Sequence, residues 1–106
     1  MQNYLPKIKL FLLGLALLLA SSLTLHAQSR EVTGTVISGE DDLPLPGVSV
    51  LVKGTVRGAV SDIDGKYKIT LQPSDQTIVY SFVGFESQEV AVNNQSTIDI
   101  TLNPDM

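Results

Sequence analysis

The sequence contains no cysteine and no tryptophan, and its single histidine is His26. Without cysteine the protein can form no disulfide, no thiolate zinc site and no lipid anchor of the cysteine type. If His26 is removed by processing, the mature chain also lacks the imidazole on which Ser–His–Asp and Cys–His nucleophiles depend. We therefore expect no catalytic residues, no cofactor and no metal site, and do not expect an enzyme.

A basic and then apolar segment opens the chain. Lys7 and Lys9 precede an uninterrupted apolar run over 10–20, and small or polar residues follow. This order is typical of a secretory signal peptide, and a run of about 11 residues is too short to span a membrane as a helix. We predict a signal peptide over 1–27, although Leu25 at the −3 position allows the cleavage site to shift. An uncleaved anchor helix is the alternative, and the predicted mature domain is 28–106.

The predicted mature chain is acidic. It has five basic residues against eleven acidic ones, which gives a formal net charge of −6. Nucleic acids and anionic lipids both bind clustered Lys and Arg, so we expect neither as a partner. The adjacent acids 40–42 are typical of a solvated turn rather than of carboxylates paired across a cleft. A catalytic pair of Ser61 with Lys66 or Lys68 would need a desolvated lysine, of which the sequence gives no sign.

After Ala27 no segment has the period of an amphipathic helix. Short runs alternate apolar and polar residues instead, and Gly, Pro, Asn and Asp clusters separate them. This spacing predicts an all-β fold, a seven-stranded antiparallel β-sandwich in which each sheet buries one face. The runs lie at 31–38, 48–52, 59–63, 66–71, 77–92 (two strands that meet near Gly84) and 97–102. On the clearest runs, alternation places the following residues on one shared face of their run: Val32, Gly34 and Val36; Val48, Val50 and Val52; Tyr67, Ile69 and Leu71; Ile98, Ile100 and Leu102.

The stretch SDIDGKYKI (61–69) has two interpretations. Asp62 and Asp64 before Gly65 resemble the start of a calcium loop. An EF-hand loop, however, needs an oxygen ligand where this chain has a lysine and a glutamate where it has Pro73. We interpret the stretch as a hairpin with a two-residue type I′ turn at Asp64–Gly65. Calcium should then leave the melting temperature unchanged, whereas Gly65→Val should lower it, and thermal unfolding with and without calcium checks both.

In that hairpin the register decides which side chains are buried. Val60 lies opposite Ile69 on the core face, and Ser61 lies opposite Lys68 on the solvent face. Asp62 accepts backbone N–H bonds within the turn. A slip of one residue would reverse this sorting.

The few aromatic residues of the predicted mature chain bear on binding. We expect Tyr67, Tyr80 and Phe82 in the core, while for Phe85 both a core and a contact role stay open. A carbohydrate-binding surface would need exposed aromatics, so it has little support in the sequence. A free sheet edge that accepts an added strand is the other route to a partner.

A spaced motif runs through the middle of the chain. Pro-Leu, Gly-Val-x-Val, Gly-Thr, Gly, Asp-x-Asp-Gly and Tyr follow one another from Pro44 to Tyr67, and an aromatic–Gly–aromatic strand pair surrounds Gly84. From about Glu31 to Leu102 the chain resembles the carboxypeptidase regulatory-like domain. It is most similar to the version at the N-terminus of SusC/RagA-type TonB-linked outer-membrane transporters. The motif residues, for which we expect structural roles, are Pro44, Gly47, Gly54, Gly58, Asp62, Asp64, Gly65, Tyr67 and Gly84.

This resemblance implies a transthyretin-like (prealbumin-like, Ig-like) sandwich at the periplasmic face of a Gram-negative outer membrane. The implied role is a non-catalytic accessory and interaction module in the import of nutrients, commonly glycans or peptides. The implied partner is a protein, either the transporter or a TonB-system component, with the outer membrane contacted only indirectly and no small-molecule ligand. Because the sequence stops at Met106 without plug or barrel, we expect either the leading piece of a transporter or a free periplasmic module. The alternative function is a secreted carbohydrate-binding or adhesive β-sandwich.

Overall fold

The computed structural model describes residue 14 and residues 29–105, so the predicted signal peptide lies outside the described residues except for Gly14. No helix among the described residues is long and apolar enough to cross a membrane. Seven strands were predicted, and the described part contains seven. They are β1 (Arg30–Ser38), β2 (Ser49–Val52), β3 (Gly58–Val60), β4 (Lys66–Leu71), β5 (Thr77–Ser81), β6 (Gln88–Ala91) and β7 (Ile100–Leu102).

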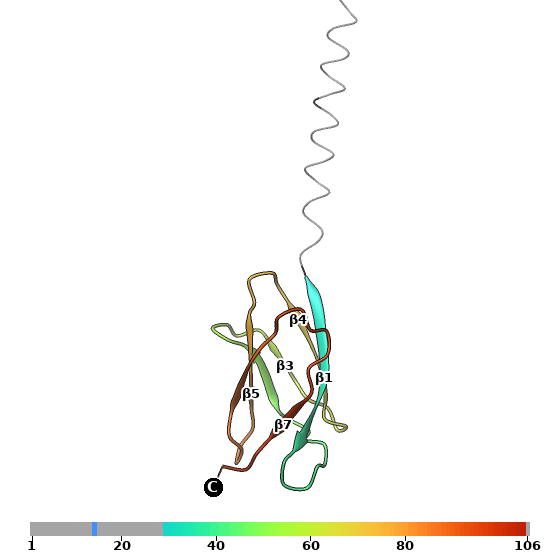
Figure 1. Ribbon diagram of the computed structural model, residues 1–106, viewed down its shortest axis with the longest axis vertical. Coiled ribbons are helices and arrows are strands. Elements are labelled where there is room, and N and C mark those ends of the chain that lie inside the picture. The colour runs from blue at the N-terminus through green and yellow to red at the C-terminus, as the bar shows by residue number, and fades with distance from the viewer. Residues whose placement is uncertain (1–13, 15–28, 106) are drawn as a thin grey trace, which may run out of the picture.

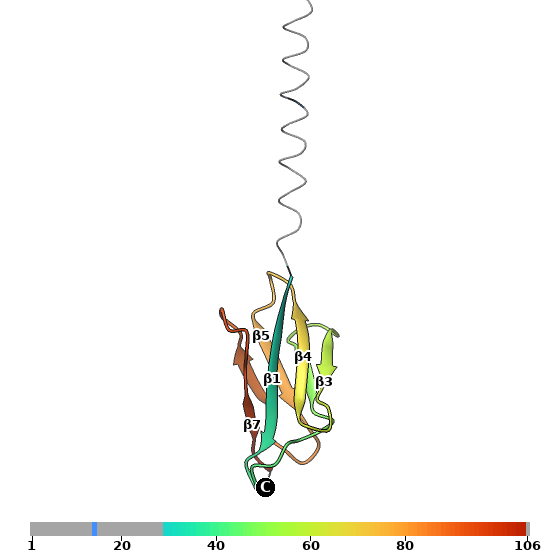
Figure 2. The ribbon, with the colours of Figure 1, turned by 90° about the vertical axis from the view of Figure 1, so that its right-hand side faces the viewer.

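The strands form two sheets that pack face to face, as Figures 1 and 2 show. One sheet has the order β4-β1-β7 and the other the order β3-β2-β5-β6, which confirms the predicted sandwich. One pair departs from the predicted antiparallel arrangement, because β7 runs parallel to β1 with Val36 opposite Ile100. Side-chain alternation is the same in parallel and antiparallel strands, so the sequence pattern gave no sign of this direction.

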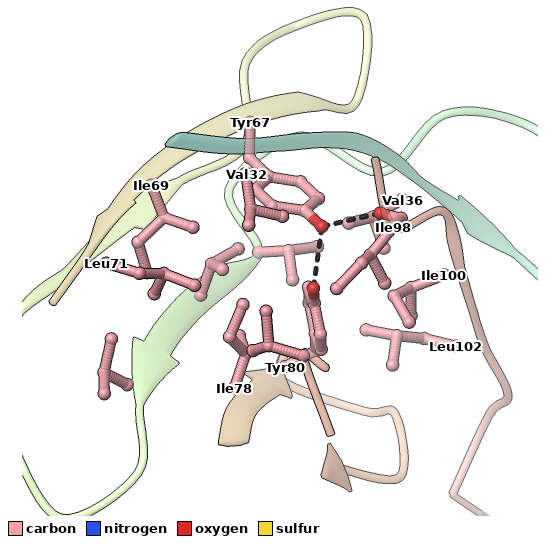
Figure 3. Close-up of a cluster of buried hydrophobic side chains, with 14 residues drawn as sticks. Val32, Val36, Tyr67, Ile69, Leu71, Ile78, Tyr80, Ile98, Ile100 and Leu102 are labelled. Atoms are coloured by element: carbon pink, nitrogen blue, oxygen red, sulfur yellow. Dashed lines mark hydrogen bonds between the residues drawn. The ribbon is translucent and has the colours of Figure 1, made fainter. Parts of the chain in front are cut away.

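The core lies between the two sheets and contains only uncharged side chains. The eleven apolar side chains on the faces named above for the clearest runs are buried, as is Tyr80, which was predicted in the core, and Ile78 and Val92 join them. Figure 3 shows these side chains meeting from both sheets. Burial of each large apolar side chain contributes about 1.5–3 kcal/mol, so this face-to-face contact is the main source of stability. Phe82, which was predicted in the core, is only partly buried, and both Phe82 and Phe85 pack against the edge of the core.

The predicted hairpin between β3 and β4 is wrong. β3 pairs with β2 in the other sheet, so the chain crosses between the sheets at 61–65. Val60 is 65% exposed and Ser61 only 5%, which reverses the predicted sorting. The Ser61 hydroxyl donates to the Leu45 carbonyl at 2.6 Å and accepts the Val48 N–H at 2.9 Å. Because both bonds are made inside the protein, this polar side chain is buried without an unsatisfied group.

Candidate interaction surface

Four segments come together at the end of the sandwich where β1 and β7 finish. The Gly39 N–H donates to the Leu102 carbonyl at 2.8 Å, and the Asp105 N–H donates to the Gly84 carbonyl at 2.9 Å. The Gly47 N–H donates to the carbonyl of Ser61 at 3.0 Å. We call this region the loop end and define it as 39–47, 61–65, 82–87 and 103–105. Figure 1 shows it opposite the start of β1.

The turn between β3 and β4 has three residues in its loop rather than the predicted two. The Gly65 N–H donates to the Asp62 carbonyl at 2.9 Å, and the Asp62 N–H donates to the Lys66 carbonyl at 2.8 Å. Within the loop Ile63–Gly65 only Gly65 has a positive φ, of 75°. A type I′ turn requires positive φ at Asp64 as well, so that prediction is wrong. The additional loop residue shifts the register by one, which accounts for the reversed burial described above.

The Asp62 carboxylate holds this turn together. Its Oδ1 atom accepts the N–H groups of Asp64 and Lys66, each at 2.9 Å, as the sequence predicted. The Asp64 side chain has no hydrogen bond within the described residues. Nor do any three His, Cys, Asp or Glu side chains of that part lie close enough to hold a metal ion.

The two aspartates should therefore differ in their effect on stability. We expect Asp62→Ala to lower the free energy of unfolding by about 1 kcal/mol, because two backbone N–H groups lose their acceptor. Asp62→Asn keeps an acceptor oxygen and should retain most of the stability. Asp64→Ala is the matched control and should be close to wild type. Urea unfolding measures all three, and equal losses at Asp62 and Asp64 would contradict the assigned role.

Gly65 lies against the segment that contains Pro44. The Gly65 carbonyl accepts the Val36 N–H at 2.8 Å. A Cβ atom on Gly65 would lie 2.5 Å from the Val36 carbonyl oxygen and 3.0 Å from the Pro44 Cβ. Pro44 itself lies opposite Ile37 in an isolated bridge. The N–H of the neighbouring Leu45 donates to the Val36 carbonyl at 2.9 Å. Proline is tolerated there because its neighbours make the bonds that it cannot.

The structure brings only some of the motif residues together. Pro44, Gly47 and the turn residues of the Asp-x-Asp-Gly motif all lie at the loop end. Gly54 and Gly58 lie elsewhere, in and just after the turn between β2 and β3. Gly84 also lies at the loop end, in the turn between β5 and β6, with a φ of 86°. Most motif residues thus lie in turns around the sandwich, while Gly58 and Tyr67 belong to strands, and together they do not form one pocket.

Tyr67 joins the two sheets through the core. Its hydroxyl donates to the Ile98 carbonyl at 2.6 Å and lies 2.7 Å from the Tyr80 hydroxyl of the opposite sheet (Figure 3). Because the Tyr67 proton is used on Ile98, the Tyr80 hydroxyl is the donor in the tyrosine pair. The rings meet edge to face with centroids 5.5 Å apart. This geometry accounts for the tyrosine of the motif, which joins β4 to the segment just before β7 and to β5.

Gly34 and Asp99 complete this arrangement and were not singled out from the sequence. The Ile98 carbonyl points under Gly34 towards Tyr67, so it does not accept the Thr35 N–H. The Asp99 carboxylate accepts that N–H instead, at 3.0 Å. A lone glycine within a strand pattern is the signal that could have indicated such a close backbone approach.

The tyrosine pair should make the protein sensitive to alkaline pH. Burial raises the pKa of Tyr67 and of Tyr80, and the Asp99 charge adds to the effect on the Tyr67 pKa. Unfolded tyrosine has a pKa of about 10, so above that pH the unfolded chain loses protons first. The free energy of unfolding then falls as pH rises, while below pH 10 it is unaffected by this pair.

Thermal unfolding at a series of pH values tests this expectation. The melting temperature should decrease above pH 10 more steeply for the wild type than for Tyr67→Phe/Tyr80→Phe, which has no buried phenol. The double variant should start from a lower value, since the Ile98 carbonyl loses its donor. Parallel curves for the two proteins would contradict the assignment.

Exposed apolar side chains gather at the loop end. Leu43 is 59% exposed, Ile63 81% and Val83 92%, each from a different loop of that end. No aromatic side chain of residues 29–105 is exposed, because Tyr67 and Tyr80 are buried and Phe82 and Phe85 are partly buried. These loops can offer aliphatic contact to another protein, and the described surface lacks the aromatic platform on which sugars stack.

Several known proteins are similar to this chain. It is 50% identical over 93 residues to a TonB-dependent receptor of Formosa agariphila, an alignment that covers 85% of this chain and 9% of the receptor. It is 35% identical over 98 residues to the TonB-dependent receptor SusC of Bacteroides thetaiotaomicron, covering 91% of this chain and 9% of SusC. The chain thus spans about a tenth of the length of these relatives.

A solved structure and a family model complete the comparison. A chain of a type II cohesin–X-dockerin complex from Acetivibrio cellulolyticus has a TM-score of 0.50 at 23% identity, covering 70% of this chain and 51% of that one. This likeness concerns the fold alone. The model of the CarboxypepD_reg-like domain matches residues 32–106, which include every strand of the sandwich except the first two residues of β1. The chain therefore belongs to the CarboxypepD_reg-like domain family.

Proposed function

We propose that this domain is a non-catalytic accessory module of a SusC-like, TonB-dependent transport system and that it works by contact with another protein. The family match carries the proposal, together with 50% identity to part of a TonB-dependent receptor. Residues 28–106 contain neither histidine nor cysteine, which is consistent with a role other than catalysis. The proposed location is the periplasmic face of the outer membrane, in the import of glycans or peptides.

The loop end is the surface that suits this role best. Leu43, Ile63 and Val83 place aliphatic side chains at the tips of three loops. The last described residues, 103–105, pair with 84–86 at the same end. In a transporter that continues beyond such a domain, this end would face the remainder of the protein. We propose that it contacts the transporter or a TonB-system component.

Site-specific photocrosslinking tests the proposal. The full chain, with a photoreactive amino acid at Ile63 or Val83, would be expressed in Bacteroides thetaiotaomicron, which carries the 35%-identical relative SusC. Irradiation should yield a crosslink to a TonB-dependent receptor or a TonB-system protein, identified by mass spectrometry. Val56 is the matched control, because it is 96% exposed but lies in the turn between β2 and β3, away from the loop end.

The outcome that would overturn the proposal is equally specific. Crosslinks to such proteins from Val56 but from neither loop-end position would remove the loop end as the contact surface. No transporter or TonB-system crosslink from any position would remove the proposed function itself. Release of the chain with the periplasmic fraction, against retention in the cytoplasm, checks the proposed location.

A further inference from the structure

Two outer strands lie side by side along one flank of the sandwich. β4 is an outer strand of the three-stranded sheet and β3 an outer strand of the four-stranded sheet. Figure 2 shows β3 next to β4, and no ladder joins the two within the described residues. A strand with one unpaired side presents backbone N–H and C=O groups that can accept another strand.

The hydrogen bonds identify which β4 groups point outward. The N–H and C=O of Lys66 are bonded to Asp62, so they point away from β1. The N–H and C=O of Thr33 both bond towards the β7 side, and Thr33 lies opposite Lys68 in the ladder. In an antiparallel ladder, two residues opposite each other either bond to each other or both point their backbone groups away from the pair. Because Thr33 points away from β4, the N–H and C=O of Lys68 point away from β1. Lys68 and, two residues on, Thr70 therefore carry the unpaired groups of this edge.

Three of the five basic side chains in residues 29–105 already have an ion pair or a hydrogen bond. Lys53 is paired with Glu89 at 2.9 Å. Arg57 donates two hydrogen bonds to Asp75, at 2.7 and 2.8 Å, and these bonds lower the pKa of that carboxyl group. Arg30 donates to two backbone carbonyls near the turn after β6.

Only Lys66 and Lys68 remain without an ion pair or a side-chain hydrogen bond within residues 29–105. Both are exposed and, being two residues apart in one strand, lie on the same outer face beside the edge. Of the acids nearest to them, Asp62 accepts two backbone N–H groups and Asp99 accepts one. Glu31, opposite Thr70, is the third carboxylate on this face.

Two hollows flank the edge. One, of about 550 Å³, lies over the outer face and is lined by Val60, Lys66 and Lys68 among others. The other, of about 440 Å³, lies between the two outer strands and is lined by Gly58, Lys68 and Thr70 among others. A Cβ atom on Gly58 would meet Val50 and Leu51 of β2, so the glycine is required by the pairing of β3 with β2.

We propose that β4 binds an extended acidic segment of a partner protein as an added strand at Lys68–Thr70. Backbone N–H and C=O groups of the segment pair with those of Lys68 and Thr70. Carboxylates at alternate positions of the segment face Lys66 and Lys68, and the intervening small or apolar residues point the opposite way, towards the hollow beside β3. This inference rests on the proposed interaction role and adds a second contact, separate from the loop end, together with the chemistry of the segment that binds there.

A second copy of this chain is a less suitable occupant. Two β4 strands paired edge to edge would bring Lys66 and Lys68 of each copy close to those of the other. Like charges across a strand pair are unfavourable, and lysine on an edge strand is a known obstacle to self-association. The same lysines attract a segment of opposite charge.

Titration followed by NMR tests the proposal with a defined probe. The probe is the capped peptide VDVDVDV, and its control is VKVKVKV. The acidic peptide should shift the backbone amide signals of Lys68 and Thr70, and the lysine peptide should bind at least about tenfold more weakly, because two attractive charge contacts become repulsive. The charge-reversal variant Lys66→Glu/Lys68→Glu should invert this preference.

A backbone variant separates strand addition from simple charge attraction. Thr70→Pro removes an N–H that points outward, so it should leave the fold intact, as proline is accepted on an edge strand. It should reduce binding of the acidic peptide by about tenfold or more, since a backbone bond is lost and the ring obstructs pairing. If Thr70→Pro unfolds the protein, the charge-reversal variant decides the test.

Three results would overturn the inference. The first is that the backbone amide signals of Lys68 and Thr70 do not shift at millimolar concentrations of the acidic peptide. The second is that a folded Thr70→Pro protein binds this peptide as tightly as the wild type does. Alternatively, light scattering would show a dimer that Thr70→Pro abolishes, which would assign the edge to a second copy. Failure of the peptide test with positive loop-end crosslinks would remove only the edge site, whereas loss of the crosslinks alone would remove only the function proposed above.

Discussion

Gly34→Ala should lower the free energy of unfolding by about 3 kcal/mol or more, because the new methyl group overlaps the backbone of another strand. The Cβ atom would overlap the Ile98 carbonyl oxygen and would lie 2.8 Å from the Tyr67 hydroxyl oxygen. To make room, the end of the chain would have to move away from β1. That movement would break the Tyr67–Ile98 hydrogen bond and leave a buried carbonyl without a donor.

Urea or thermal unfolding followed by circular dichroism measures this effect. For a domain of this size, a loss of 3 kcal/mol corresponds to a decrease in melting temperature of about 12 °C or more. Thr33→Ala is the matched control: it is a neighbour in the same strand and points outward, so it should cost less than about 1 kcal/mol. A Gly34→Ala protein as stable as the Thr33→Ala protein would contradict the close approach of Ile98.

Gly65→Val should have the second large effect, again about 3 kcal/mol or more, from two additive causes. The φ of 75° at Gly65 is unfavourable for a β-branched residue. The Cβ atom would also lie 2.5 Å from the Val36 carbonyl oxygen and 3.0 Å from Pro44. Relief of this overlap would separate the turn from the segment around Pro44 and open the loop end.

Gly54→Val separates the two causes. Gly54 has a φ of 81°, close to that of Gly65, but nothing lies within 4 Å of the position that its Cβ would occupy. It should therefore show the cost of the backbone conformation alone, about 1–2 kcal/mol. The difference between the two variants measures the packing of the turn against Pro44. Equal losses in thermal unfolding would mean that this packing contributes nothing.

These two predictions bear on the family motif. Its turn residues at Asp62 and Gly65 act through the backbone of the loop end, and its tyrosine acts inside the core. If the loop end contacts a partner, a variant such as Gly65→Val should reduce crosslinking from Ile63 even where the protein still folds. The structural roles proposed for the remaining motif residues can be tested in the same unfolding assay.

The sequence by itself determined most of the buried side chains of the strands, but not those beside the turn between β3 and β4. Alternation along each strand is a local property, because successive side chains point to opposite faces. The residues predicted to face inward, such as Val32, Val50 and Ile69, are therefore buried in the structure. The family was recognisable for a similar reason, because its turn residues serve the backbone next to them. Asp62 accepts two N–H groups of its own turn, and Gly65 adopts a positive φ there.

The tertiary structure alone decided how the strands are joined. The pairing of β3 with β2, the parallel direction of β7 and the burial of Ser61 all depend on partners distant in the sequence. An alternation of period two fits either sheet and either direction, and one additional turn residue exchanges the two faces. The need for glycine at position 34 likewise follows from Ile98, which is distant in the sequence and reaches β1 only when the end of the chain pairs beside it.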